Sequence, residues 1–477
     1  MLTIGLKDII AAADVQVAGS LDSEIEFRWI ERNSRSIVAG DLFIAVRGER
    51  FDGHSFIADA AARGATAALV ARSWAVDSAT GSPIPLLIAD DPVVVLQQVA
   101  AARRDALEMT VIGITGSIGK TSTKEVVAAV VGQRFATYRS PGNMNSELGL
   151  PLSLLEVEPG TEVAVLEMGG AYAFGELALL AEIAKPKYAI VTNIHPVHLE
   201  RMGSIEAIAE TKAELVLAIP EDGAAILNGD DPRARAMCSL CRGRVVTYGL
   251  NADNDVWADR VETDGLRGSS FRLHLGGENY HLKVPLVGGH AVELALAAIA
   301  IGHAMGMHVS EMVPGFSSPG IQVRLLLIDG PNGSRIIDDT YNASAPSVLS
   351  ALGLLHQLGA GRKIAVLGDM RELGSVMEEQ HRLVGRRAAE VVDHLITFGE
   401  LAKIIAEEAQ SASRESGGRP LTVTSFGLNE RDEIVSYLLE QLREGDIALL
   451  KGSRGLEMED FVVALQRACE LKTDGDR

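Results

Sequence analysis

The chain has 477 residues, of which 47% are apolar and 23% charged, and its net charge is −20. At roughly 100–200 residues per domain this length predicts two to four domains, and the composition excludes a mainly disordered or fibrous protein. The acidic balance argues against nucleic acid as a partner. The longest apolar stretch, residues 294–302, is about half of the ~20 residues that a membrane span needs. We therefore expect a cytoplasmic protein with no membrane span, and its three cysteines fit a reducing compartment.

Residues 1–108 form the first predicted domain, which closes with an amphipathic helix over residues 93–109. The second predicted domain, residues 109–318, opens with a buried strand over residues 110–116, a glycine-rich loop, and a helix over residues 120–133. Helical stretches then alternate with further expected strands, at residues 162–169, 188–194 and 223–231. This alternation predicts a mostly parallel sheet with right-handed crossovers.

The pattern becomes strand-rich from about residue 245 to residue 287, and a helix over residues 293–306 closes the second domain. The third predicted domain, residues 319–477, alternates again, with strands expected at residues 334–341, 363–370, 394–399, 421–427 and 446–453. Each of these strands ends in polar or glycine residues, which is typical of a doubly wound sheet with ligand residues at its carboxyl edge. We predict an α/β protein of three domains: a smaller N-terminal α/β domain, a central domain with a P-loop ATPase-like parallel sheet, and a C-terminal Rossmann-like domain.

The clearest local signal is the sequence Gly-Ile-Thr-Gly-Ser-Ile-Gly-Lys-Thr-Ser at residues 113–122. Small residues before a helix let backbone N–H groups face phosphate oxygens, and the helix N-terminus favours anions. Lys120 would reach the β- and γ-phosphates of a nucleotide, and the Thr121 hydroxyl would bind Mg²⁺. The strict pattern has glycine at position 114, so this is a relaxed form, and an ordinary tight turn is the alternative. The residues expected to bind ATP here are Gly116, Ser117, Gly119, Lys120, Thr121 and Ser122.

Several polar residues follow the loop, and their order reduces the number of reactions that the sequence could support. Glu167 ends the predicted strand 162–169, where a carboxylate can hold a metal ion beside a triphosphate. His198 follows the next strand, and Lys212 lies further on. Taken singly, a histidine or lysine is more often a surface residue or a helix cap.

Together these segments resemble the Mur ligases of peptidoglycan synthesis, over essentially the whole chain. The resemblance begins with Asn33-Ser34-Arg35 and the GDLFIA segment in the first domain. In the second domain it covers GITGSIGKTSTKE, GNMNSELGLP, LEMG, TNIHPVHLERMGSIEAIAETKAEL and NGDD, and in the third IIDDTYNASAPSV, VLGDMRELG and KGSRGLEME. The GNMN element and the YNA triplet are similar to the dipeptide-adding member of the family.

The resemblance implies a role for each matching residue around the metal ions. Thr121 and Glu167 would hold one Mg²⁺, and His198 a second. Lys212 would be carbamylated by CO₂ and would become a carboxylate-like ligand between the metals. With Lys120, the residues Glu167, His198 and Lys212 would be the catalytic set.

The resemblance also implies contacts to the substrates. Arg324 would contact the γ-phosphate of ATP, Asp339 the ribose, and His290 the adenine, although Ala291 and Leu294 stand where the family usually has asparagines. The residues expected to bind the other substrates are Ser34, Arg35, Asn143, Asn145, Tyr341 and Asn342.

The implied reaction is an ATP-dependent, ADP-forming ligation that joins D-Ala-D-Ala to UDP-MurNAc-tripeptide through an acyl phosphate, in the synthesis that supports cell-wall biogenesis, cell shape and cell division. ATP and Mg²⁺ would be its cofactors, and the protein would be a monomer. Two alternatives remain. A folylpolyglutamate synthetase would keep the loop but lack the Ser34-Arg35 and GDLF motifs. A non-catalytic paralogue that binds nucleotide would have lost one of the four catalytic residues, all of which are present.

Overall fold

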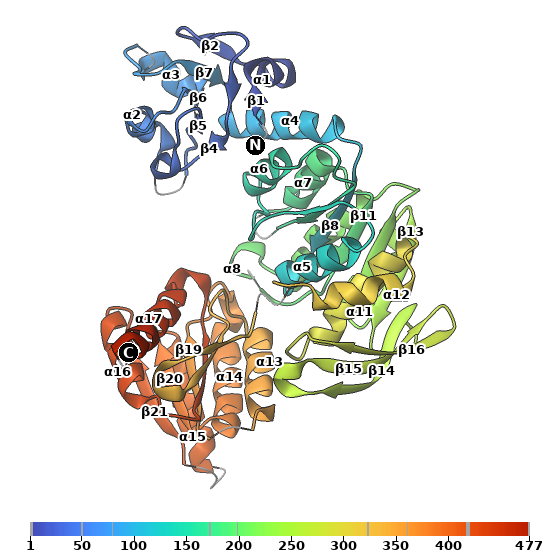
Figure 1. Ribbon diagram of the computed structural model, residues 1–477, viewed down its shortest axis with the longest axis vertical. Coiled ribbons are helices and arrows are strands. Elements are labelled where there is room, and N and C mark those ends of the chain that lie inside the picture. Colours follow the sequence, from blue (N-terminus) through green and yellow to red (C-terminus); the bar gives the residue numbers. More distant parts are fainter. Residues whose placement is uncertain are drawn as a thin grey trace.

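The structure is a computed structural model that describes residues 3–48, 51–78, 80–170, 173–197, 199–321, 324–359, 361–415 and 420–475. Figure 1 shows the chain passing through three α/β bodies in order, from the N-terminal body at the top to the C-terminal body at the lower left. The predicted α/β class and three-domain organisation are confirmed. The domain boundaries at residues 108 and 318 stay predictions.

The N-terminal domain contains a sheet in the order β2-β7-β6-β5-β4, in which β4 to β7 are parallel and β2 is antiparallel. Its strands are β2 (Gln16–Ala18), β4 (Ile30–Glu31), β5 (Leu42–Ile44), β6 (Ala67–Ala71) and β7 (Leu86–Ala89), with β1 (Ile4–Gly5) and β3 (Glu26–Phe27) paired separately. Its helices are α1 (Leu6–Ala12), α2 (Ile57–Ala62), α3 (Arg72–Ser78) and α4 (Pro92–Asp105).

Helix α4 joins the first domain to the second. The Asp91 side chain accepts from the backbone N–H of Val93, and Pro92 occupies the first turn, so the helix begins where its sequence favours a start. Gln97 donates to the backbone carbonyl of Glu147 at 3.1 Å. Apolar residues of α4 share a core with α6 (Gly149–Leu155) and α7 (Glu176–Ala184) of the next domain. This shared core anchors the N-terminal domain to the central one.

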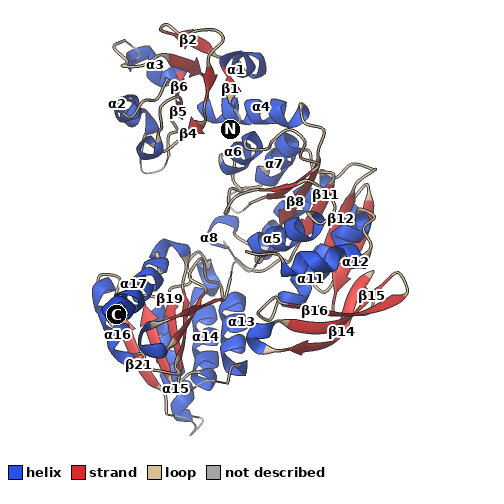
Figure 2. Ribbon diagram, viewed as in Figure 1, coloured by secondary structure: helices blue, strands red, loops and turns tan. Residues whose placement is uncertain are grey.

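The central domain contains a sheet in the order β16-β15-β14-β13-β12-β11-β8-β10-β9. Neighbours from β9 to β14 are parallel, and β14, β15 and β16 pair antiparallel. The strand-rich stretch after residue 245 therefore extends the parallel sheet (Figure 2). The strands are β8 (Thr110–Thr115), β9 (Thr137–Arg139), β10 (Val163–Glu167), β11 (Tyr188–Val191), β12 (Ala224–Asn228), β13 (Arg244–Gly249), β14 (Val256–Thr263), β15 (Ser269–Leu275) and β16 (Glu278–Val284).

The central strands β8, β10, β11 and β12 are buried on both faces of this sheet. Successive side chains of a strand point to opposite faces. In β8, Val111 packs with α4, α6 and α7, whereas Ile112 and Ile114 pack with α5 (Lys120–Val131) and α11 (Ala291–Ala304). Further helices are α8 (Leu199–Met202), α9 (Ile205–Leu217), α10 (Pro232–Ala236) and α12 (Val309–Met312). The packed faces leave the carboxyl edge of the sheet to bind ligands.

The C-terminal domain contains a sheet in the order β17-β18-β22-β19-β20-β21, parallel except for β17 at its edge. The strands are β17 (Leu326–Asp329), β18 (Arg335–Asp338), β19 (Lys363–Gly368), β20 (His394–Phe398), β21 (Thr422–Phe426) and β22 (Ile447–Lys451). The helices are α13 (Ala345–Gln357), α14 (Met377–Val391), α15 (Ala402–Glu415), α16 (Arg431–Gln441) and α17 (Glu459–Gly475). Among the described helices, none is long and apolar enough to cross a bilayer.

Candidate active site

A cavity of about 1010 Å³ is lined by both the central and the C-terminal domains. Its walls come from segments that follow the carboxyl ends of β8, β10 and β11 on one side and of β18, β19 and β22 on the other. Most of the predicted site residues line it: Gly116, Ser117, Gly119, Lys120, Thr121, Ser122, Asn143, Asn145, Glu167, Lys212, His290, Arg324, Asp339, Tyr341 and Asn342.

The loop between β8 and α5 has the backbone that phosphate binding requires. Gly116 has φ +140°, and a Cβ there would lie 2.0 Å from the Thr192 hydroxyl oxygen. Gly119, at φ +84°, precedes the first turn of α5. Gly113 does not belong to this loop, because it lies within β8, where a Cβ would come 2.9 Å from the Met168 sulfur. Gly116 and Gly119 therefore allow the loop to turn, whereas Gly113 allows close packing.

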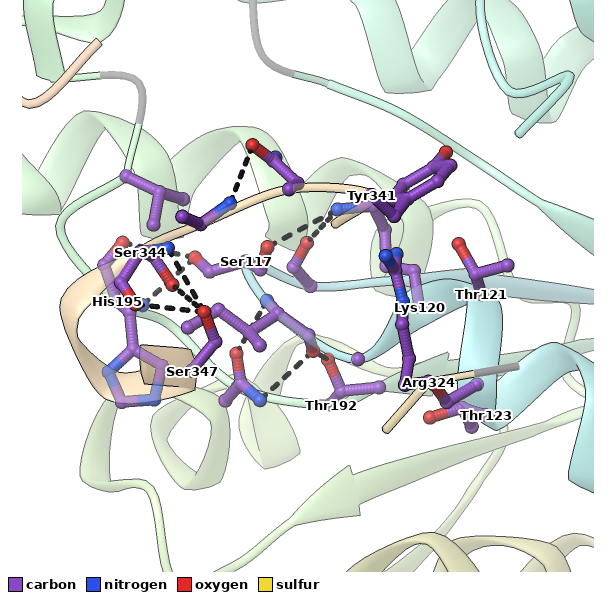
Figure 3. Close-up of a pocket in the computed structure, with 18 of the residues that line it drawn as sticks. Ser117, Lys120, Thr121, Thr123, Thr192, His195, Arg324, Tyr341, Ser344 and Ser347 are labelled. Carbon is purple, nitrogen blue, oxygen red and sulfur yellow. Dashed lines mark hydrogen bonds between the residues drawn. The ribbon is translucent and has the colours of Figure 1, made fainter. Parts of the chain in front are cut away.

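The Lys120 side chain folds back over this loop. Its Nζ donates to the backbone carbonyl of Gly116 at 2.8 Å and lies 3.4 Å from that of Ser117. Burial lowers the pKa of Lys120, Glu167 raises it and Arg324 lowers it. Figure 3 shows Lys120 beside Arg324 and Tyr341, which come from the other side of the cavity. The ammonium therefore lines the cavity at the loop that the sequence predicts to bind phosphate.

Glu167 lies between two hydrogen-bond donors. The Thr121 hydroxyl donates to one carboxylate oxygen at 2.9 Å, and the Asn145 side-chain amide donates to the other at 2.6 Å. In the sheet, Glu167 pairs with Ile114, so it lies level with the start of the phosphate-binding loop. A hydroxyl, a carboxylate and an amide at one point are oxygen ligands of the kind that Mg²⁺ prefers. In the described part of the chain no three His, Cys, Asp or Glu side chains cluster as a metal site.

Lys124 is a site residue that sequence reasoning missed. It is fully buried, and its Nζ donates to the backbone carbonyls of Ser140 at 2.6 Å and Gly142 at 2.7 Å. Its Nζ also lies 3.2 Å from the Glu125 carboxylate. These contacts fix the start of the loop that carries Asn145. Two sequence signals point to it: its place in the GITGSIGKTSTKE motif and its position on the side of α5 that otherwise carries buried apolar residues.

Lys212 lies on α9 and is buried. Its Nζ donates to the backbone carbonyl of Gly170 and lies 3.5 Å from that of Gly169. Burial, and secondly the nearby charge of Lys120, lowers the pKa of Lys212 to about 7. Two residues further along α9, Glu214 accepts from the backbone N–H groups of Gly175 and Ala178 at 2.7 and 2.9 Å. The helix thus holds the segment after β10 by two side chains.

The C-terminal domain contributes a buried ion pair. Lys451, at the end of β22, donates to the Asp339 carboxylate at 2.6 Å and to the backbone carbonyl of Asn342 at 2.8 Å. The Arg324 guanidinium carbon lies 3.7 Å from the ring centroid of Tyr341. Burial raises the pKa of Tyr341, and the nearby Thr121 side chain lowers it. Tyr341 therefore lies near Thr121 across the cavity. Lys451 was not among the predicted site residues, although it begins the KGSRGLEME motif.

Two of the predicted residues that the structure describes stand apart from this cluster. Ser34 is buried in the N-terminal domain, where its nearby hydroxyl lowers the pKa of the Asp59 carboxylate, and the adjacent Arg35 is exposed. Neither is among the described residues that line the cavity. His198 lies outside the described residues. His290 lines the cavity and precedes α11, and its hydrogen bond with Glu293 raises its pKa.

Comparisons with known proteins match the whole chain to one family. Models of the Mur ligase family catalytic domain, the Mur ligase middle domain, and the Mur ligase glutamate ligase domain match residues 26–112, 114–302 and 323–454. The UDP-N-acetylmuramoyl-tripeptide--D-alanyl-D-alanine ligase of Bacillus subtilis is 37% identical, covering 97% of this chain and 98% of the relative. The Escherichia coli ligase of the same name is 31% identical, covering 98% and 99%.

Solved structures give the same result. A crystal structure of MurF from Acinetobacter baumannii superposes with a TM-score of 0.84 at 28% identity, covering 98% of this chain and 99% of that one. The MurF ligase of Thermotoga maritima, in complex with ADP, gives a TM-score of 0.76 at 28% identity, covering 93% and 98%. With relatives above 30% identity along nearly the whole length, this chain belongs to the Mur ligase family.

Proposed function

We propose that this protein is an ATP-dependent, ADP-forming ligase that adds D-Ala-D-Ala to UDP-MurNAc-tripeptide in peptidoglycan precursor synthesis. The observation that carries the proposal is one cavity in which Lys120, Thr121 and Glu167 of the central domain face Arg324 and Tyr341 of the C-terminal domain. A phosphate-binding loop alone fits many reactions. Opposed walls from two domains also provide room for a carboxylate to be activated and for an amine to attack it.

Thr121 and Glu167, with Asn145 holding the carboxylate, fit Mg²⁺ by their oxygen donors. When bound, Mg²⁺ neutralises charge on the transferring phosphoryl group. We assign a second metal contact to His198 from the family resemblance.

Lys212 suits carbamylation because the reaction with CO₂ requires a neutral amine. Its pKa of about 7 leaves a substantial neutral fraction near neutral pH. The carbamate would give this buried position an anionic group beside the positive charge of Lys120.

The chain's own residues then account for the two chemical steps. Lys120 and Arg324 would hold the γ-phosphoryl group while the tripeptide carboxylate attacks it to give an acyl phosphate and ADP. The acceptor amine would attack the acyl carbon, and phosphate would leave. Because acyl phosphates hydrolyse readily, the two domain walls would protect the intermediate by excluding water.

The remaining contacts to the substrates lie both outside and inside the cavity. Ser34 and Arg35 would hold the UDP end of the substrate, with Asn143, Asn145, Tyr341 and Asn342 nearer the reaction. Asp339 would contact the ATP ribose, and His290 the adenine. We further propose a cytoplasmic, monomeric enzyme that supports cell shape and division.

The test is phosphate release from ATP with UDP-MurNAc-tripeptide and a panel of amines. We expect strong stimulation by D-Ala-D-Ala and much weaker stimulation by D-Ala, D-Glu or a diamino acid, because polar groups left unpaired in the acceptor pocket discriminate strongly. A reaction without amine is the control for uncoupled hydrolysis. Preference for a single amino acid would reject the dipeptide assignment and leave the ligase chemistry standing.

A further inference from the structure

Two arginines of the C-terminal domain line the cavity with no carboxylate partner among the described residues. Arg371 follows β19 and Arg454 follows β22, and these strands are parallel neighbours. Another arginine of the cavity wall, Arg201, lies 4.0 Å from the Glu372 carboxylate. In a chain of net charge −20, two uncompensated guanidinium groups at one sheet edge favour an anionic ligand there.

The backbone around both arginines is fixed by hydrogen bonds. The Arg371 N–H donates to the hydroxyl of buried Ser453 at 2.9 Å, and the Arg371 guanidinium donates to the backbone carbonyl of Gly455 at 3.3 Å. Arg371 is thus held against the residues on either side of Arg454. The Arg454 guanidinium carbon lies 5.3 Å from the Tyr341 ring centroid, within the range of a cation–π contact. Both side chains are exposed, and these contacts hold the Arg371 guanidinium beside the segment that carries Arg454.

The phosphate end of the cavity has its own cations. Lys120 belongs to the phosphate-binding loop. Burial is the main cause that lowers the pKa of Lys120, and the nearby charge of Arg324 lowers it further. Arg324 also packs on the Tyr341 ring, with 3.7 Å from its guanidinium carbon to the centroid. Tyr341 thus contacts an arginine that serves the phosphates and a second arginine, Arg454, on the segment after β22.

We propose that Arg454 and Arg371 bind the C-terminal carboxylate of the acceptor dipeptide and so orient its amine toward the acyl phosphate. This inference rests on the proposed ligase function. The attacking amine must be neutral, so the carboxylate is the lasting charge of the acceptor. A guanidinium fork matches a carboxylate with two parallel hydrogen bonds, and backbone anchoring reduces the entropy lost on binding.

The experiment compares D-Ala-D-Ala with its C-terminal amide, D-Ala-D-alaninamide, as acceptors for the wild-type enzyme, Arg454→Met and Arg371→Met. We expect the wild type to prefer the acid over the amide in kcat/KM by about 10- to 100-fold, as for a lost charge-assisted hydrogen bond. In Arg454→Met this preference should fall to within a few-fold of unity, mainly through a raised KM for the acid. Arg371→Met should show the same change, and Arg454→Lys an intermediate one.

Arg414→Met is the matched control, since this exposed arginine lies on α15 outside the cavity lining, and it should keep the wild-type preference. The proposal would be overturned if the arginine variants lost kcat/KM equally with the acid and the amide. It would also be overturned if they kept the preference for the acid and instead had a raised KM for ATP or UDP-MurNAc-tripeptide. If the wild type ignores D-Ala-D-Ala but uses another amine, the proposed function fails separately. The same acid and amide comparison on that amine then decides the role of the arginines.

Discussion

Replacing Lys124 with methionine tests whether a fully buried lysine sets the geometry of the metal-binding side. The substitution keeps the length of the side chain and removes both hydrogen bonds, to the carbonyls of Ser140 and Gly142. Hydrogen bonds from a charged donor contribute about 1.5–3 kcal/mol each. Removing a buried charge from water-free surroundings offsets part of that loss.

We therefore expect the free energy of unfolding of the central domain to fall by about 2–4 kcal/mol, which corresponds to a thermal midpoint lower by about 5–10 °C. The freed segment carries Asn145, which holds Glu167 by a 2.6 Å hydrogen bond. The rate should therefore fall about 10- to 100-fold as the site loses its geometry, and half-saturation should require more Mg²⁺.

The assay combines a thermal melt with phosphate release across a Mg²⁺ titration. Lys187→Met is the control, because the Lys187 and Asp222 side chains pair on the surface at 40% and 73% exposure and such pairs contribute about 0–1 kcal/mol. An unchanged melt and rate for Lys124→Met would refute the reasoning. A lower melt with an unchanged Mg²⁺ requirement would refute the link from Lys124 to the metal-binding residues.

Three further substitutions test separate parts of the account. Lys120→Ala should lower phosphate release at saturating ATP by at least about 100-fold with a nearly unchanged thermal melt, and equal turnover would reject the phosphate-binding loop. Lys212→Ala should be inactive and partly rescued by short carboxylates, and ¹³C NMR under ¹³CO₂ should show a carbamate signal in the wild type that the variant lacks; full activity of the variant would contradict the carbamate. His381 is fully buried, accepts from the backbone N–H of Met370 and donates to the carbonyl of Met377, and burial lowers its pKa. Its neutral form is favoured in the folded state, so its contribution to stability is complete above pH ~6.5 and is lost as the pH falls toward the lower folded pKa. The free energy of unfolding, measured at several pH values, should fall less toward acid pH in His381→Gln than in the wild type. If it falls equally in both proteins, His381 does not cause the acid loss of stability.

The order of strands and helices was predictable because each element has a strong local pattern. The expected helix over residues 120–133 is α5 (Lys120–Val131), and the expected strand over residues 363–370 is β19 (Lys363–Gly368). Apolar runs between glycine-rich turns specify such elements without knowledge of the rest of the chain. The edge strand β17 (Leu326–Asp329) was missed, because a short strand of intermediate exposure has little local signal.

The polar contacts of the site were less predictable than its residues. Asp339 was expected as a ligand contact, yet its 2.6 Å ion pair with Lys451 joins residues 112 positions apart. Lys124 was missed because lysines are seldom fully buried, and only the folded position of residues 140–142 gives its ammonium acceptors. Motif spacing identifies residues near a ligand, whereas the contacts that orient them depend on pairing between distant segments.

Four lysines lie in or beside the cavity, and the groups that contact each ammonium distinguish lysines with a structural role from those with a chemical role. Lys124 and Lys451 each combine a carboxylate with backbone carbonyls, so their charges are compensated within the protein. Lys120 and Lys212 contact backbone carbonyls and have no carboxylate ion pair among the described residues. A lysine whose charge the protein leaves uncompensated either finds an anion in the ligand or loses its charge. We expect Lys120 to follow the first course, with a phosphate as its anion, and Lys212, with its pKa of about 7, to follow the second.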